Sequence, residues 1–142
     1  MQIRLAETAG FCFGVERAVA LAEQTARTCK NAVTLGPIIH NRHVVERFER
    51  LGLHEISSAE EAEPGQTVVI RAHGIPVSEQ RMLSARGAAA VDATCPFVKK
   101  IHVIAQKAER DGRSLLIIGT PTHPEVAAIA SYSSDAHVFQ TA

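Results

Sequence analysis

The sequence predicts an α/β protein built on parallel β-sheets. Short apolar runs alternate with runs of helical period along the 142 residues. Such alternation implies right-handed βαβ crossovers between parallel strands. Hydrophobic residues make up 46% of the chain and charged residues 21%, which suits a globular protein with a sizeable core. The length suits one domain, or one domain with part of a second.

Charge and hydropathy narrow the class of protein. Formal net charge is zero, which gives no electrostatic reason to expect binding to nucleic acid or to an anionic membrane surface. No apolar stretch approaches the roughly 20 residues that a membrane span needs. The N-terminus MQIRLAETAGFCFG lacks a basic region followed by a long apolar run, so we expect no signal peptide and a cytoplasmic location. Three cysteines in such a chain favour thiol or metal chemistry over a disulfide framework.

The first part of the chain is expected to form one complete sheet with its helices. Strands are predicted at IRLAE (3–7), NAVTLG (31–36), LHEI (53–56), QTVVIRA (66–72) and AAAVDA (88–93). Helices are predicted for residues 15–29, 43–52 and 77–87, with a serine-capped turn at 57–65 that ends at Pro64-Gly65. In the first helix one face carries Val15, Ala18, Val19, Ala22 and Ala26, and in the second the inward side chains are Val44, Val45, Phe48 and Leu51, before Gly52 as the stop.

The second part begins with the most regular helix of the sequence, PFVKKIHVIAQKAERDG (96–112). Pro96 suits its first turn and Gly112 its end. One face of it is predicted to carry Phe97, Ile101, Ile104, Ala105 and Ala108. A strand at SLLIIG (114–119), a helix at EVAAIASY (125–132) and a strand starting in AHVFQ (136–140) follow.

Reactive side chains fall at five strand-to-helix junctions: Cys12 in GFCFGV, His40 in PIIHNR, His73 in HGIP, Cys95 in TCPF, and His123 with Glu125 in TPTHPE. One such residue alone is more often a solvated side chain or a buried thiol, but five junctions of one kind favour a shared site. In an open parallel sheet the carboxyl ends of the strands form the ligand-binding edge. Helix N-termini at that edge suit phosphate, and they lower the pKa of a thiol towards thiolate.

The remaining thiol and imidazoles carry no such turn motif. We interpret Cys29 as structural, and His43, His54, His102 and His137 as packing or surface residues. The two cysteines and three histidines at the junctions could hold a metal, bind an anion or divide these tasks. Zinc sites usually show close-spaced ligand pairs, which are absent here, so an iron–sulfur cluster assembled from distant turns fits better. Clusters usually take four thiolates, and only two are well placed.

Five motifs carry a family resemblance. GFCFGVERA, GPIIHNRHVVERF, RAHGIP, DATCPFVKKIH and GTPTHPEV resemble, in that order, the motifs of the LytB/IspH family of hydroxymethylbutenyl diphosphate reductases. The resemblance runs through the whole chain but covers only about the N-terminal half of the family's usual length. It implies three similar α/β domains around a central 4Fe–4S cluster held by three cysteines. It also implies the terminal step of the non-mevalonate isoprenoid pathway, in which electrons from a reduced ferredoxin or flavodoxin remove the allylic hydroxyl to give isopentenyl and dimethylallyl diphosphate.

The resemblance also implies roles for two cysteines and boundaries for the domains. Cys12 and Cys95 match two of the cluster ligands, while the third cysteine of the family lies downstream. Residues 14–93 match the first domain and residues 94–142 the first half of the second. Residues 1–13 match a strand and turn that belong to the third domain. We therefore expect an N-terminal fragment that is inactive by itself.

The remaining site residues concern the substrate. His40 and His73 match residues that bind the diphosphate, and His123 matches a histidine that binds the substrate and relays protons. Glu125 matches the acid that delivers a proton to the leaving hydroxyl or to the allyl fragment. Two other functions stay open. One is a zinc-dependent hydrolase or deaminase, with Cys12, Cys95 and a histidine as ligands and Glu125 as general base. The other is a non-catalytic diphosphate-binding module.

Overall fold

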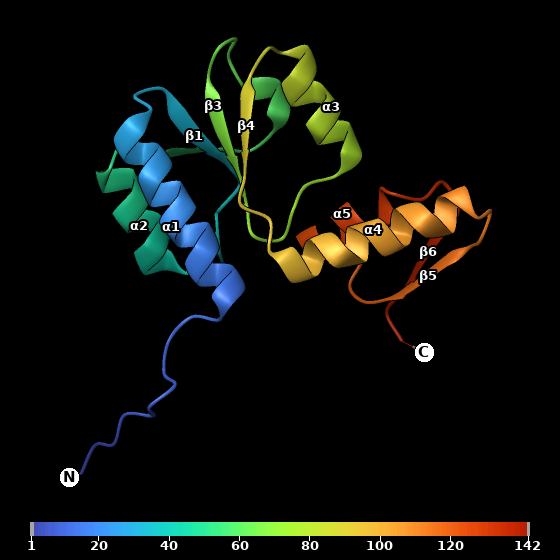
Figure 1. Cartoon of the computed structure of the whole chain (residues 1–142), viewed down its shortest axis with the longest axis horizontal. Helices are drawn as coiled ribbons and strands as arrows, with labels where there is room; N and C mark the ends of the chain where they lie inside the picture. Colours follow the sequence, from blue (N-terminus) through green and yellow to red (C-terminus); the bar gives the residue numbers. More distant parts are fainter. Residues whose placement is uncertain (1, 142) are drawn as a thin grey trace.

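The computed structural model describes residues 2–141, and within them two parallel sheets form two α/β units that lie side by side (Figure 1). Met1, the first residue of the predicted segment 1–13, and Ala142, the last residue of the predicted segment 94–142, lie outside the described residues. No helix among the described residues is both long and apolar enough to cross a membrane.

The first unit holds a four-stranded parallel sheet in the order β2-β1-β3-β4. Its elements are α1 (Phe13–Thr28), β1 (Ala32–Leu35), α2 (Arg42–Arg50), β2 (His54–Ile56), the short 3-10 helix η1 (Ala59–Glu61), β3 (Thr67–Ile70), α3 (Val77–Ala85) and β4 (Ala89–Asp92). Figure 1 shows α1 and α2 on one face of this sheet and α3 on the other.

Burial on both faces explains why the central strands are apolar without alternation. In β3, Val69 packs with α1 and α2 in one core cluster, while Val68 and Ile70 pack with Leu83 of α3 in the other. Ala18 and Ala22 of α1 are fully buried against the first cluster. Such small side chains allow a helix to approach a sheet closely. The predicted inward positions Val44 and Phe48 of α2 are also confirmed, but Leu51, predicted inward, is 36% exposed just after the last turn of α2.

The second unit is smaller. It consists of α4 (Pro96–Arg110), β5 (Leu115–Ile118), α5 (Pro124–Ala130) and β6 (Ala136–Phe139), with β5 and β6 paired in parallel. It follows the order of the first unit, since α1, β1, α2 and β2 also follow one another in this way. Cys95 precedes His123 by the same spacing by which Cys12 precedes His40. The two units are thus built on one plan.

The strand predicted at residues 3–7 is wrong for this structure. Residues 2–12 form no strand and extend away from both units (Figure 1). A strand exists only through hydrogen bonds to a neighbour, and no strand within residues 2–141 pairs with this segment. The other six predicted strands and five predicted helices are present, with ends shifted by a few residues.

The predicted inward face of α4 is also wrong in part. Phe97 and Ile104 are each 63% exposed, whereas Val98, His102 and Ala105 are buried. The helix carries apolar residues on more than one face, so its sequence alone does not select the face that packs. One face of α4 is covered by α5 and by the turn after β3. The face that carries Phe97 and Ile104 is exposed to solvent.

Candidate active site

Three imidazoles from three different turns lie together at the carboxyl edge of the strands. The ring centroids of His40 and His73 are 4.8 Å apart, those of His73 and His123 are 5.8 Å apart, and those of His40 and His123 are 6.5 Å apart. His40 and His73 follow β1 and β3 of the first unit, while His123 follows β5 of the second. The structure therefore brings the three predicted histidines into one cluster that spans both units.

Backbone hydrogen bonds that continue beyond the strands fix the turns of the first unit. The Ala72 N–H donates to the Ile38 carbonyl over 3.1 Å, and the Cys95 N–H donates to the Ala72 carbonyl over 2.9 Å. These bonds tie the turn before His40, the turn before His73 and the turn that holds Cys95 to one another. The site is thus an extension of the parallel ladder rather than a set of independent loops.

His73 is the most perturbed member of the cluster. It is half-buried, and its Nδ1 atom is buried without a hydrogen-bond partner. Burial is the main cause that lowers the pKa of His73 to about 4, and the neighbouring His40, His123 and Arg71 act in the same direction. His73 is therefore neutral at pH 7, and its orphaned nitrogen is a polar group that a bound ligand or water could satisfy.

His123 is oriented by its own helix. Its Nδ1 accepts a hydrogen bond from the Glu125 N–H at 3.2 Å, so the side chain caps the N-terminus of α5. Accepting at Nδ1 leaves the proton of a neutral ring on Nε2, which is then free to donate. Pro124 suits the first helical position because it has no N–H to satisfy. Glu125 lies half-buried in the same first turn, two residues from His123.

The two predicted thiols start two helices. Cys12 and Cys95 are the N-cap residues of α1 and α4, neither side chain caps its helix, and both are free cysteines. Gly14 lies in the first turn of α1, and a Cβ atom added to it would overlap the Cys95 Sγ. The Cys95 thiol therefore packs directly on the backbone two residues after Cys12.

Polar contacts hold the Cys95 turn in place. Arg17 of α1 donates from Nη1 to the Thr94 carbonyl at 3.2 Å, which links the helix after Cys12 to the turn before Cys95. The Asp92 Oδ1 accepts from the Thr94 N–H at 2.9 Å, and its Oδ2 pairs with Lys99 Nζ at 2.6 Å. Burial alone would raise the pKa of Asp92, but hydrogen bonds from Lys99 and Thr94 lower it below its ordinary value.

Among residues 2–141, no group of three or more His, Cys, Asp or Glu side chains could hold an ion. This gives no support to the zinc alternative, which needs Cys12, Cys95 and a histidine around one ion. Two thiols at neighbouring helix starts do suit part of an iron–sulfur ligand set. Cys29, predicted to be structural, packs against the core of the first unit.

Sequence reasoning missed Arg17 and Asp92. Arg17 and Asp92 fix the Cys95 turn, as described above. His102, predicted to be a packing or surface residue, is buried, with 6% of its surface exposed, so the packing role is confirmed; it lies beside the turn that holds His73. The sequence signal for His102 was a polar side chain on an otherwise apolar face of the helix that directly follows Cys95.

The comparisons agree with this architecture. A family model described as LytB protein matches residues 3–142. The 4-hydroxy-3-methylbut-2-enyl diphosphate reductase of Citrifermentans bemidjiense is 42% identical over 134 residues, which cover 94% of this chain and 47% of that protein. The reductase of the same name from Aquifex aeolicus is 44% identical over 133 residues, covering 93% of this chain and 46% of that protein.

Solved structures give the same result. A structure of (E)-4-hydroxy-3-methyl-but-2-enyl diphosphate reductase, described as the terminal enzyme of the non-mevalonate pathway, matches with a TM-score of 0.82 and 41% identity, over 98% of this chain and 51% of that one. The Plasmodium falciparum E-1-hydroxy-2-methyl-but-2-enyl-4-diphosphate reductase matches with a TM-score of 0.88 and 27% identity, over 94% of this chain and 43% of that one. The chain spans about half the length of the curated relatives it matches. The resemblance read from five short motifs is confirmed: this chain belongs to the LytB protein family.

Proposed function

We propose that this chain contributes two cluster thiolates and a diphosphate-binding imidazole cluster to an iron–sulfur reductase of 4-hydroxy-3-methylbut-2-enyl diphosphate. The observation that carries the proposal is the meeting of His40, His73 and His123 beside the Cys95 turn. The relatives that it matches along nearly its whole length bear the name of that activity. The reaction consumes two electrons and two protons, breaks the allylic C–O bond and releases water.

The imidazoles suit the diphosphate. Neutral His73 and the Nε2–H of His123 can donate to phosphate oxygens, and His40 is exposed beside them. An anion bound there would favour the protonated form of the His73 ring and so raise the pKa of His73 from its lowered value. The N-terminus of α5 adds the positive end of its dipole behind His123.

Glu125 and His123 suit the proton steps. In our proposal the Glu125 carboxyl gives a proton to the leaving hydroxyl oxygen, which lets the C–O bond break with loss of water rather than hydroxide. His123, two residues before Glu125 in the chain, binds the substrate and returns a proton to the Glu125 carboxylate. The second proton goes to the allyl fragment, and the carbon that receives it decides between isopentenyl and dimethylallyl diphosphate.

Cys12 and Cys95 would hold the cluster, of the 4Fe–4S type, together with a third cysteine from outside residues 2–141. When bound, that group would supply the electrons for C–O cleavage, delivered by a reduced ferredoxin or flavodoxin. For this chain's own residues the consequence is that both thiols must ionise. Each of them directly precedes a helix, Cys12 before α1 and Cys95 before α4. The cytoplasm, where such carriers and reduced thiols coexist, remains the proposed location.

A chimera tests the proposal. Residues 1–142 are joined to the matching second half of the Citrifermentans bemidjiense reductase and reconstituted anaerobically with iron and sulfide. We expect a brown protein that consumes the diphosphate substrate with a chemical reductant. Cys12→Ser and Cys95→Ser should lose iron, whereas Cys29→Ser should keep it. A folded chimera that takes up no iron, or one that keeps its iron in the Cys95→Ser variant, would refute the proposal.

A further inference from the structure

His102 of α4 packs against the turn that carries His73. A Cβ atom added to Gly74 would lie 2.7 Å from the His102 Cε1 and 3.4 Å from its Nε2, so the edge of the imidazole rests on the Gly74 backbone. Gly74 has a φ of +76°, a conformation that favours glycine. Gly74, next to His73, thus has a backbone conformation that favours glycine and is in direct contact with His102 of the second unit.

Tyr132 extends this contact to α3. Its ring stacks on His102, with centroids 4.6 Å apart and planes inclined by 29°. Its hydroxyl accepts a hydrogen bond from Gln80 Nε2 at 2.7 Å, and the same amide donates to the Ile75 carbonyl at 3.2 Å. Gly74 and Ile75, the two residues that follow His73, are therefore both held through this set of side chains.

Ser131 adds a third link. Its Oγ accepts from the Val77 N–H, at the start of α3, over 3.0 Å. We call His102, Ser131 and Tyr132 the inter-unit contact. Beside it lies a cavity of about 210 Å³ lined by residues of both units. The inter-unit contact joins the units on this side of the cavity, while Arg17 and Asp92 link the first unit to the Cys95 turn and to α4.

The imidazole cluster depends on this register. His40 and His73 belong to the first unit and His123 to the second. The first two are fixed to each other by the backbone bonds between their turns. The position of His123 relative to His40 and His73 depends on how the second unit packs against residues 73–80. The inter-unit contact binds to that segment directly.

We infer that His102 and Tyr132 are positioning residues that set the separation between His123 and the His40–His73 pair, and thereby the affinity of the cluster for a diphosphate group. The part about affinity rests on the proposed function. The part about separation rests only on the contacts above. Neither His102 nor Tyr132 belongs to the imidazole cluster itself, so their substitution tests geometry without removing a ligand-binding group.

Inorganic pyrophosphate is the first probe. Its binding to the 142-residue chain is measured by calorimetry for the wild type and for His102→Ala and Tyr132→Phe. We expect the dissociation constant to rise about tenfold in His102→Ala, since misplacing one of three converging donors removes a charge-assisted bond. Tyr132→Phe keeps the ring stack and loses only the bond from Gln80, so a rise of about threefold is expected. Ile104→Ala, at an exposed position of the same helix, should bind as the wild type does.

The second measurement does not need an anion. Proton NMR titration follows the pKa of His73, which is about 4 with His40, His123 and Arg71 around it. Loosening the inter-unit contact exposes the ring and separates it from His123, so the pKa should rise by about one unit in His102→Ala, towards the ordinary 6.5. A purely structural role would lower thermal stability and leave this pKa unchanged in the folded variant.

The outcomes separate the two proposals. If the wild type binds no pyrophosphate but the pKa of His73 rises in the variants, the proposed function fails and the positioning role stands. If pyrophosphate binding and the pKa of His73 are unchanged in Tyr132→Phe and in folded His102→Ala, the inference is overturned. Should His102→Ala fail to fold, Tyr132→Phe decides by the same two readouts.

Discussion

At the scale of single residues, a missing side chain matters as much as a present one. Gly14 is buried in the first turn of α1, where the Cys95 thiol occupies the space that a Cβ would need. A helix normally gains from replacing glycine by alanine, by about 1 kcal/mol. The glycine at this position is therefore explained by the neighbouring thiol rather than by the helix.

Gly14→Ala should destabilise the chain by about 1–3 kcal/mol despite its better helix propensity, because the new methyl forces the Cys95 turn aside. Urea unfolding measures the loss. In a Cys95→Ala background the obstructing sulfur is absent and only the contact with the Cβ of residue 95, at 3.1 Å, remains, so the same substitution should cost less. An equal penalty in both backgrounds would show that the thiol contact is not the cause.

His73 makes stability depend on pH. Its pKa is about 4 in the folded chain against an ordinary 6.5. Between these values the unfolded chain binds a proton that the folded chain does not, so stability is complete above about pH 6.5 and falls as the pH is lowered to about 4. After discounting for partial exposure, the loss is on the order of 1 kcal/mol.

Thermal unfolding between pH 4 and 7 measures this effect. His73→Gln should show a smaller loss across the window than the wild type, while His54→Gln, at an exposed strand position, should follow the wild type. Identical pH profiles for His73→Gln and the wild type would contradict the lowered pKa.

At the scale of elements, helix starts deliver the functional side chains. α1, α4 and α5 begin directly after Cys12, Cys95 and His123, and α2 begins two residues after His40. Where α2 starts, the Asn41 side chain accepts from the Val44 N–H at 3.3 Å and so acts as the N-cap. A cap that fixes where a helix begins also fixes the residue before it.

Asn41→Ala should cost about 1 kcal/mol, the usual effect of deleting an N-cap. Asn41→Asp retains a side-chain acceptor and should cost less than half of that. Urea unfolding of both variants distinguishes a lost cap from a lost surface contact. If Asp and Ala were equally destabilising, the hydrogen bond to Val44 would not be what stabilises this end of α2.

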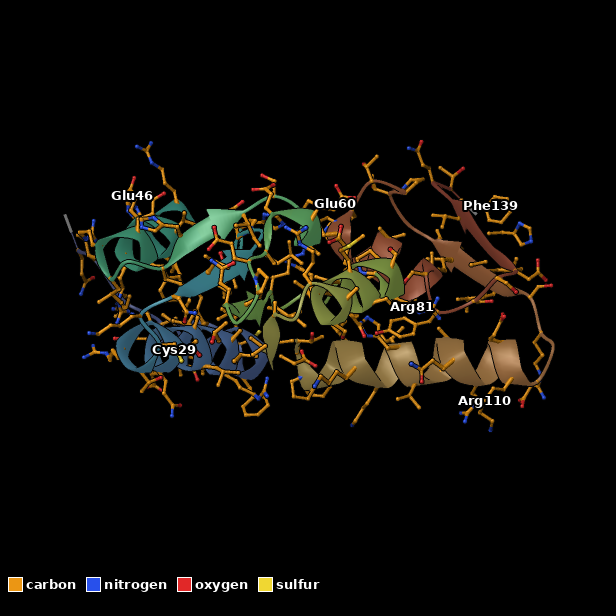
Figure 2. All side chains as sticks on the ribbon, turned by 90° about the horizontal axis from the view of Figure 1, so that it is seen from above. Cys29, Glu46, Glu60, Arg81, Arg110 and Phe139 are labelled. Atoms are coloured by element: carbon orange, nitrogen blue, oxygen red, sulfur yellow. The ribbon has the colours of Figure 1, made fainter. Side chains whose placement is uncertain are left out.

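At the scale of the molecule, the two units differ in how well they are covered. The first has helices on both faces of its sheet, whereas β5 and β6 leave Leu116, Ile118 and Phe139 between 51% and 67% exposed. Figure 2 shows Phe139 at the end of the second unit that points away from the first. In α4, Phe97 and Ile104 are also exposed, at 63% each, so the second unit of an isolated chain presents many large apolar side chains to solvent.

The isolated chain should therefore associate with itself as its concentration rises. Sedimentation velocity at several concentrations measures this, and the double variant Phe97→Ser, Ile104→Ser should shift the distribution towards monomer. Lys107→Ser on the same helix is the control and should not. A wild-type chain that stays monomeric at all concentrations would contradict the prediction.

The sequence by itself determined the class of fold and most of its elements. Apolar runs such as VVI in β3 and the helical spacing of Ala18 and Ala22 are local signals, and burial follows from them directly. It also determined which turns carry chemistry, because a parallel sheet collects its strand ends at one edge whatever the details of packing. The meeting of His40 and His73 follows from that rule, whereas His123 follows a strand of the other sheet and joins them only through the packing of the two units.

Only the tertiary structure decided which surfaces pair. Residues 3–7 have the composition of a strand but no partner within residues 2–141, and strand formation requires one. In α4 the buried face runs through His102 rather than Phe97 and Ile104, and on that face His102 contacts Gly74 and stacks on Tyr132, residues far from it in the chain. Pairing depends on groups far apart in the chain, and no local pattern records which of them will meet.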